Sequence, residues 1–98
     1  MTEEAGETAY LVESYRPGAS REEVRHASRR LAAAAAALAR RGEPVRFRGS
    51  TFLPGEESCF HRFSGGSADV VARVCAAAQV QAAHIHEVID LEEERCES

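Results

Sequence analysis

The sequence predicts an α+β domain of the ferredoxin-like type, with the element order β-α-β-β-α-β. Two segments with helical periodicity stand between four short segments rich in β-branched and aromatic residues. Pro54-Gly55 joins the second and third strand segments with no helix between them, which indicates a hairpin in the middle of the chain. These observations together predict a four-stranded antiparallel sheet with both helices on one face.

The first half of the domain is expected to be a strand followed by a long helix. The strand covers about residues 8–15, and the turn sequence at 16–18 ends it. Ser20 and Glu23 have the spacing of a capping box, so the helix should begin at Ser20. Leucine and alanine recur along one stripe of this helix, and Gly42 supplies its C-terminal stop.

The second half is expected to contain a strand hairpin, a helix and a last strand. The hairpin strands cover about residues 45–53 and 58–63. Ser67 is a suitable N-cap for a helix over about 68–79, and the last strand covers 83–91. The split βαβ order follows from these assignments.

The chain of 98 residues is expected to be one domain, residues 9–91, between two flexible acidic arms at 1–8 and 92–98. The net charge is -4 and the arginines are spread along the chain, which argues against nucleic acid as a partner. A small ferredoxin-like sheet leaves one face bare, and a second copy of the chain is its usual cover. We therefore expect a homodimer.

The compartment predicted from the sequence is the cytoplasm. The longest apolar run, around residues 32–37, is far too short to span a membrane, and the acidic N-terminus lacks the apolar core of a signal peptide. Cys59, Cys75 and Cys96 do not form an even disulfide framework, so reduced thiols are expected. A composition rich in Ala and Arg and without Lys is typical of a bacterial protein from a GC-rich genome.

His61 is an ionisable residue on what strand alternation predicts to be an apolar face, shared with Cys59 and Phe63. From the other strands, the face under the helices is expected to receive Tyr10, Val12 and Ser14; Val45, Phe47, Gly49, Thr51 and Leu53; and Ile85, Glu87, Ile89 and Leu91. An imidazole near a carboxylate in a pocket under an alanine-rich helix is suited to general acid-base chemistry. In this interpretation His61 is the acid-base residue and Glu87 orients it. The alternative is a core histidine hydrogen-bonded to a hydroxyl or a carbonyl group.

The substrate of such an enzyme would be a small hydrophobic or aromatic molecule. The residues expected to bind it are Tyr10, Glu13, Ser14, Phe47, Thr51 and Cys59. Glu13 lies on the other sheet face, where it either pairs with Arg46, Arg48 or Arg62 or positions an anionic or phenolic ligand. Cys59 is disfavoured as a nucleophile because burial raises the pKa of a thiol.

His84 and His86 form a second candidate site. Residues i and i+2 of a strand point the same way, about 6.5–7 Å apart along the chain, so both imidazoles can bind one transition metal. The alternative is a solvated edge strand whose polar residues point outward.

The runs "YLVESYRPGASREEV" and "PVRFRGSTFLPGEESCFHRF" resemble a family of small ferredoxin-like bacterial proteins, the domain of unknown function numbered 4242. The resemblance covers roughly residues 9–91 and is most specific in the hairpin "STFLPGEESCF". It implies a dimeric ferredoxin-like fold, and some members of the family are described as nickel-binding. Related dimeric α-β barrels include cofactor-free oxygenases and cyclases of aromatic natural products, which use a cavity between sheet and helices.

Three functions are therefore carried forward. The first is a biosynthetic enzyme without a cofactor, a cyclase, isomerase or oxygenase that uses His61 for acid-base chemistry. The second is a protein that binds nickel or zinc through His84 and His86. The third is a structural or regulatory dimer without catalysis.

Overall fold

The computed structural model describes residues 8–91 as four strands and two helices, in the predicted order. The elements are β1 (Thr8–Tyr15), α1 (Arg21–Arg40), β2 (Val45–Leu53), β3 (Ser58–Gly65), α2 (Ala68–Ala78) and β4 (His84–Val88). Thr8 belongs to β1, while the remainder of the two predicted arms and Cys96 lie outside the described residues. Among the described residues, no helix is both long and apolar enough to cross a membrane.

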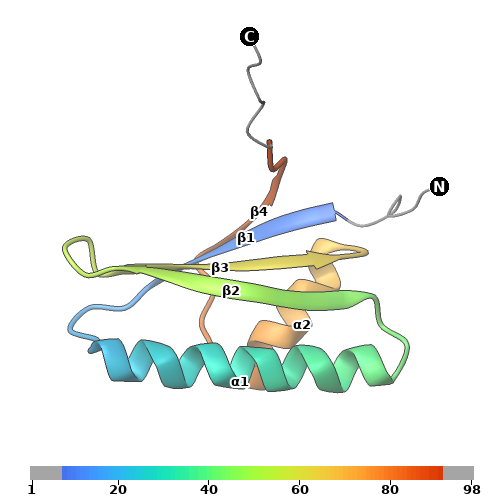
Figure 1. Ribbon diagram of the computed structural model, residues 1–98, viewed down its shortest axis with the longest axis horizontal. Coiled ribbons are helices and arrows are strands. Elements are labelled where there is room, and N and C mark those ends of the chain that lie inside the picture. The colour runs from blue at the N-terminus through green and yellow to red at the C-terminus, as the bar shows by residue number, and fades with distance from the viewer. Residues whose placement is uncertain (1–7, 92–98) are drawn as a thin grey trace, which may run out of the picture.

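The strands form one antiparallel sheet in the order β2-β3-β1-β4, with β3 and β1 in the centre. Both helices lie against the same face of this sheet, below it in Figure 1, and no described element covers the opposite face. The predicted ferredoxin-like α+β arrangement is confirmed. We call the face without helices the bare face.

Local side-chain chemistry sets the helix ends. The Ser20 hydroxyl accepts from the Glu23 amide at 3.1 Å, and the Ser20 amide donates to the Glu23 carboxylate at 2.9 Å, which completes the predicted capping box. Ser67 caps α2 through the amide of Val70 at 3.2 Å. Helix α2 ends at Ala78, and its C-cap residue Gln79 has the left-handed conformation with φ 59°, which glycine adopts most readily.

The core lies between the helices and the sheet. Its largest fully buried apolar side chains are Phe63, Leu31, Val12, Val70, Val71 and Val74. Burying a side chain of this size stabilises the fold by about 1.5–3 kcal/mol. This packing holds α1 and α2 in place over the sheet.

Strand β2 does not keep the strict alternation of side chains that its sequence predicts. A β-bulge lies between Phe47 and Gly49, and Gly49 has φ 128°. Beyond the bulge Ser50 pairs with His61 and Phe52 pairs with Cys59, so these residues face the helices. The assignment of Gly49, Thr51 and Leu53 to the face under the helices was wrong, because the extra residue reverses the direction of every later side chain.

Strand β4 is shorter than predicted and ends at Val88. Ile89 and Leu91, expected under the helices, are 83% and 86% exposed. Ile85 is the residue of this strand that packs against the core.

Candidate functional site

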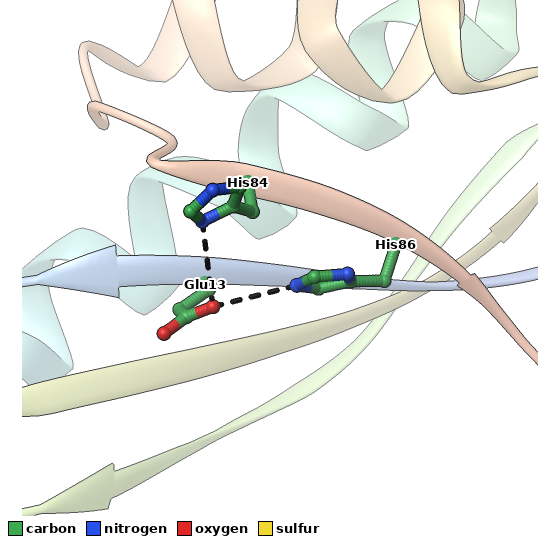
Figure 2. Close-up of side chains that lie close together, drawn as sticks. All are labelled: Glu13, His84 and His86. Carbon is green, nitrogen blue, oxygen red and sulfur yellow. Dashed lines mark hydrogen bonds and ion pairs between the residues drawn. The ribbon is translucent and has the colours of Figure 1, made fainter.

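Three potential metal ligands, Glu13, His84 and His86, come together on the bare face. In the pairing of β1 with β4, Glu13 lies opposite His84 and Leu11 lies opposite His86. Because His84 and His86 are two residues apart in an edge strand, both imidazoles point to the face that carries Glu13. Figure 2 shows both rings directed towards the Glu13 carboxylate on the neighbouring strand.

The donor atoms of this cluster lie close together. His84 Nδ1 is 3.6 Å and His86 Nε2 is 3.4 Å from the same oxygen, Oε1 of Glu13. One donor atom from each residue lies within 4.8 Å of the other two. The two imidazoles stack with ring centroids 5.6 Å apart and planes 26° apart. A metal with bonds of about 2.1 Å holds its ligand atoms about 3.0–3.4 Å apart, so modest side-chain rotations would complete a site.

The cluster is open to solvent. The side chains of His84, His86 and Glu13 are 67%, 47% and 38% exposed. Exposed contacts of this kind contribute little to folding stability, typically about 0–1 kcal/mol. The contacts between Glu13 and the two histidines therefore add little to the stability of the fold.

The shared direction of His84 and His86 was predictable from their spacing, but the part played by Glu13 was not. Glu13 was expected opposite Arg46, Arg48 or Arg62, or as a ligand-positioning residue. Its contacts are with the two histidines instead, because β4 pairs with β1 at this edge and places His84 opposite it.

His61 is buried in the core, with 1% of its surface exposed. A hydrogen bond of 2.7 Å joins its Nδ1 to Oγ of Ser50, and a second of 3.1 Å joins Oγ of Ser50 to Oγ of Ser28 on α1. The prediction that Glu87 orients His61 was wrong. Glu87 pairs with Tyr10, sits on the edge strand two strands from β3, and is exposed.

The buried imidazole is neutral at pH 7. Burial is the main cause that lowers the pKa of His61 to about 4, and the positive charge of Arg16 lowers it further. Within residues 8–91, Nε2 of His61 has no hydrogen-bond partner. A group with this pKa is a weak base, and its Nδ1 is already occupied by Ser50.

The other predicted substrate-binding residues divide between the two faces. Tyr10, Ser14 and Cys59 are buried on the helix side as expected, and Phe47 packs there against Phe63 with ring centroids 5.3 Å apart. Thr51 is exposed, and its hydroxyl accepts a hydrogen bond of 2.9 Å from Arg62.

The two buried thiols have the properties of core residues. Burial raises the pKa of Cys59, with the positive charge of Arg16 opposing the shift, and raises that of Cys75 to about 11. Neither thiol is therefore a ready nucleophile.

Two hydroxyl residues near His61, Ser28 and Ser50, were missed. With Arg21, Val24, Arg25 and Phe52 they line a small pocket of about 160 Å³ beside α1. The signal that could have revealed Ser50 is Gly49, since a glycine inside a strand often marks a bulge.

Comparisons with known proteins support the fold. No family model matches the chain, and the search of curated proteins found no match. The chain is similar to the protein in "Crystal structure analysis of SCO4226 from Streptomyces coelicolor A3(2)", with a TM-score of 0.68 and 22% sequence identity. The match covers 86% of this chain and 99% of that chain. The likeness shows a shared ferredoxin-like α+β fold, and the resemblance to the family numbered 4242 stays a prediction.

Proposed function

We propose that this protein binds a divalent transition-metal ion, Ni²⁺ or Zn²⁺, through Glu13, His84 and His86. The observation that carries the proposal is the convergence of three donor atoms within 4.8 Å of one another.

The donor set supports this choice of ion. Imidazole nitrogen suits nickel and zinc, and one carboxylate offsets part of the ion's charge. Three protein ligands on one side of the ion leave its remaining positions to water or to a partner. In the single chain the histidines are about half exposed or more, so an ion could reach them without unfolding the sheet.

The strand pairing supports the site by holding the ligands before any ion arrives. Antiparallel pairing of β1 with β4 sets the separation of Glu13 from His84, and the alternation of β4 sets that of the two imidazoles. Metal and protons compete for imidazole nitrogen, so acid should weaken binding.

Isothermal titration calorimetry with NiCl₂ and ZnCl₂ on untagged protein stripped with a chelator tests the proposal. One ion should bind per chain at pH 7.5, with a Kd below about 100 μM. His84→Ala, His86→Ala and Glu13→Gln should each weaken binding by about ten-fold or more. Paramagnetic broadening by Ni²⁺ in NMR spectra should centre on β4 and the adjacent half of β1.

His26→Ala is the matched control, because His26 is another exposed histidine that contacts a glutamate, Glu22, at 3.5 Å. Its removal should leave the affinity unchanged. Binding that survives the loss of both His84 and His86, or no binding of either ion, would rule the site out.

The enzyme without a cofactor is a second candidate, favoured by one observation. The hydrogen-bonded chain Ser28–Ser50–His61 connects a buried imidazole to the pocket of about 160 Å³ beside α1. Acid-base chemistry on a small hydrophobic or aromatic molecule would then pass through Ser50. An NMR screen of aromatic fragments tests it: shifts at Ser50 that Ser50→Ala abolishes would support it, and a screen without such shifts would count against it.

A homodimer through the bare face is also part of the proposal. Leu11, Phe60 and Val88 are apolar and lie only half-buried on that face, which a second copy would cover. Light scattering coupled to size-exclusion chromatography should give twice the mass of 10.6 kDa. A monomer at micromolar concentration would contradict both this dimer and the structural role that depends on it.

A further inference from the structure

A second pocket lies on the helix side of the sheet, away from the metal cluster. It has a volume of about 360 Å³ and opens where the end of β1, the start of α1 and the end of α2 meet. Its polar lining residues are Ser14, Tyr15, Arg16, Glu23, Gln79 and Gln81. A pocket of this size is within the range that small ligands use, and its lining calls for a polar rather than an apolar molecule.

Ser14 is one of the residues that line this pocket, and it carries a buried hydroxyl. Its side chain is on the helix side of β1, 1% of the residue is exposed, and Oγ has no hydrogen-bond partner among residues 8–91. A buried hydroxyl left in this state costs about 1–3 kcal/mol. A ligand group that hydrogen-bonds to Oγ would recover part of that cost.

Arg16 supplies a positive charge at the same place. Its backbone is held by hydrogen bonds to Glu57 at 2.7 Å and Ala19 at 3.2 Å. Its guanidinium makes no hydrogen bond or ion pair with another side chain or carbonyl within residues 8–91. The charge lies near enough to the buried face to lower the pKa values of His61 and Cys59. A guanidinium of this kind can hold a carboxylate through two parallel hydrogen bonds.

Gln79 and Gln81 line the pocket from the end of α2 and the segment that follows it. Gln79 has a left-handed backbone with φ 59°, which costs about 1–2 kcal/mol in any residue with a Cβ. Glycine would remove that strain but would also remove the side chain from the pocket. A strained backbone at a residue that lines a pocket suggests that the Gln79 side chain has a role in binding.

We propose that this pocket binds a small monocarboxylate that also carries an amide or hydroxyl group. Arg16 would bind the carboxylate of the ligand, and Gln79 and Gln81 would hydrogen-bond to its amide or hydroxyl group. Ser14 would hydrogen-bond to the ligand's most deeply buried polar atom. The carboxylate of Glu23 also lines the pocket, and one of its oxygens is occupied by the Ser20 amide. Its negative charge repels any anion and repels a dianion more strongly, so a ligand with one carboxylate is preferred to a ligand with two.

NMR titration of ¹⁵N-labelled protein with succinamate tests the proposal, with succinamide and succinate as the neutral and dianionic comparisons. The titrations use the full chain with His84→Ala and His86→Ala, plus EDTA, so that metal binding cannot contribute. Succinamate should shift the amides of Ser14, Arg16, Gln79 and Gln81 with a Kd of about 10 mM or below. Succinamide and succinate should each bind at least about ten-fold more weakly than succinamate. Succinamide lacks the charge-assisted hydrogen bonds to Arg16, and the second charge of succinate is repelled by Glu23.

Matched variants locate the binding. Arg16→Gln should abolish it and Ser14→Ala should weaken it several-fold, whereas Arg29→Gln, at an exposed arginine of α1, should have no effect. Ser64→Ala is the control for Ser14, because Ser64 also has a buried hydroxyl without a partner but does not line this pocket. No shifts with succinamate, equal binding of succinamide, or binding that survives Arg16→Gln would overturn the proposal.

Discussion

Burial of His61 as a neutral imidazole predicts that acid destabilises the protein. An unfolded histidine has a pKa near 6.5, and the folded protein lowers the pKa of His61 to about 4. The unfolded state therefore binds a proton over a pH range in which the folded state does not. The stability that this group contributes is complete above about pH 6.5 and is lost as the pH falls towards 4.

The size of the effect follows from the two pKa values. The shift of about 2.5 units corresponds to about 3 kcal/mol over the whole range. Between pH 7.5 and pH 5.0, linkage assigns about 2 kcal/mol of the lost unfolding free energy to His61. That is a large fraction of the stability expected for a domain of this length.

Urea unfolding followed by far-UV circular dichroism at pH 7.5 and 5.0 measures this loss. The loss in His61→Asn should be smaller than in wild type by about 2 kcal/mol, because the variant keeps every other titrating group. Ser64→Ala, which removes no titrating group, should lose as much unfolding free energy as wild type between pH 7.5 and 5.0. If His61→Asn does not fold, NMR titration of the His61 ring in wild type gives the pKa directly. A ring that titrates near pH 6.5 would refute the reasoning.

Three further substitutions test the backbone and core by urea unfolding at pH 7.5. Gly49→Ala should lower the unfolding free energy by about 1–2 kcal/mol, because φ is 128° and a Cβ would meet the Arg62 guanidinium; equal stability would show that the bulge carries no strain. Gln79→Gly should raise it by about 1 kcal/mol through release of the left-handed strain, and a loss would mean that the side chain contributes to packing. Ser64→Ala should leave it unchanged or raise it by up to about 1 kcal/mol, since the hydroxyl has no partner in the described chain; a clear decrease would reveal one.

Much of the architecture was predictable from the sequence because its signals are local. The capping box at Ser20 and Glu23 and the N-cap at Ser67 have their partners three residues away, so no tertiary information is needed to recognise them. The Pro54-Gly55 turn and the helical periodicity are equally local. They determined the order of strands and helices, and that order left few ways to form the sheet.

The environment of His61 depended on tertiary structure. Alternation of side chains from Val45 predicted Thr51 on the face of His61. The bulge at Gly49 reverses the direction of the later side chains, so Ser50 lies next to His61 instead. Glu87 was assigned the correct face, yet pairing with Tyr10 left it at the sheet edge. Alternation predicts the face of a side chain only where no bulge interrupts the strand, whereas its neighbours depend on the register.

The same distinction applies to the metal cluster. The sequence by itself determined that His84 and His86 point the same way, since side chains alternate along a strand. Glu13 lies 71 residues before His84 in the chain, and only the tertiary structure decided that it joins the two histidines. The physical reason is that strand pairing through backbone hydrogen bonds, together with burial of the helix-facing side chains, sets which distant residues become neighbours.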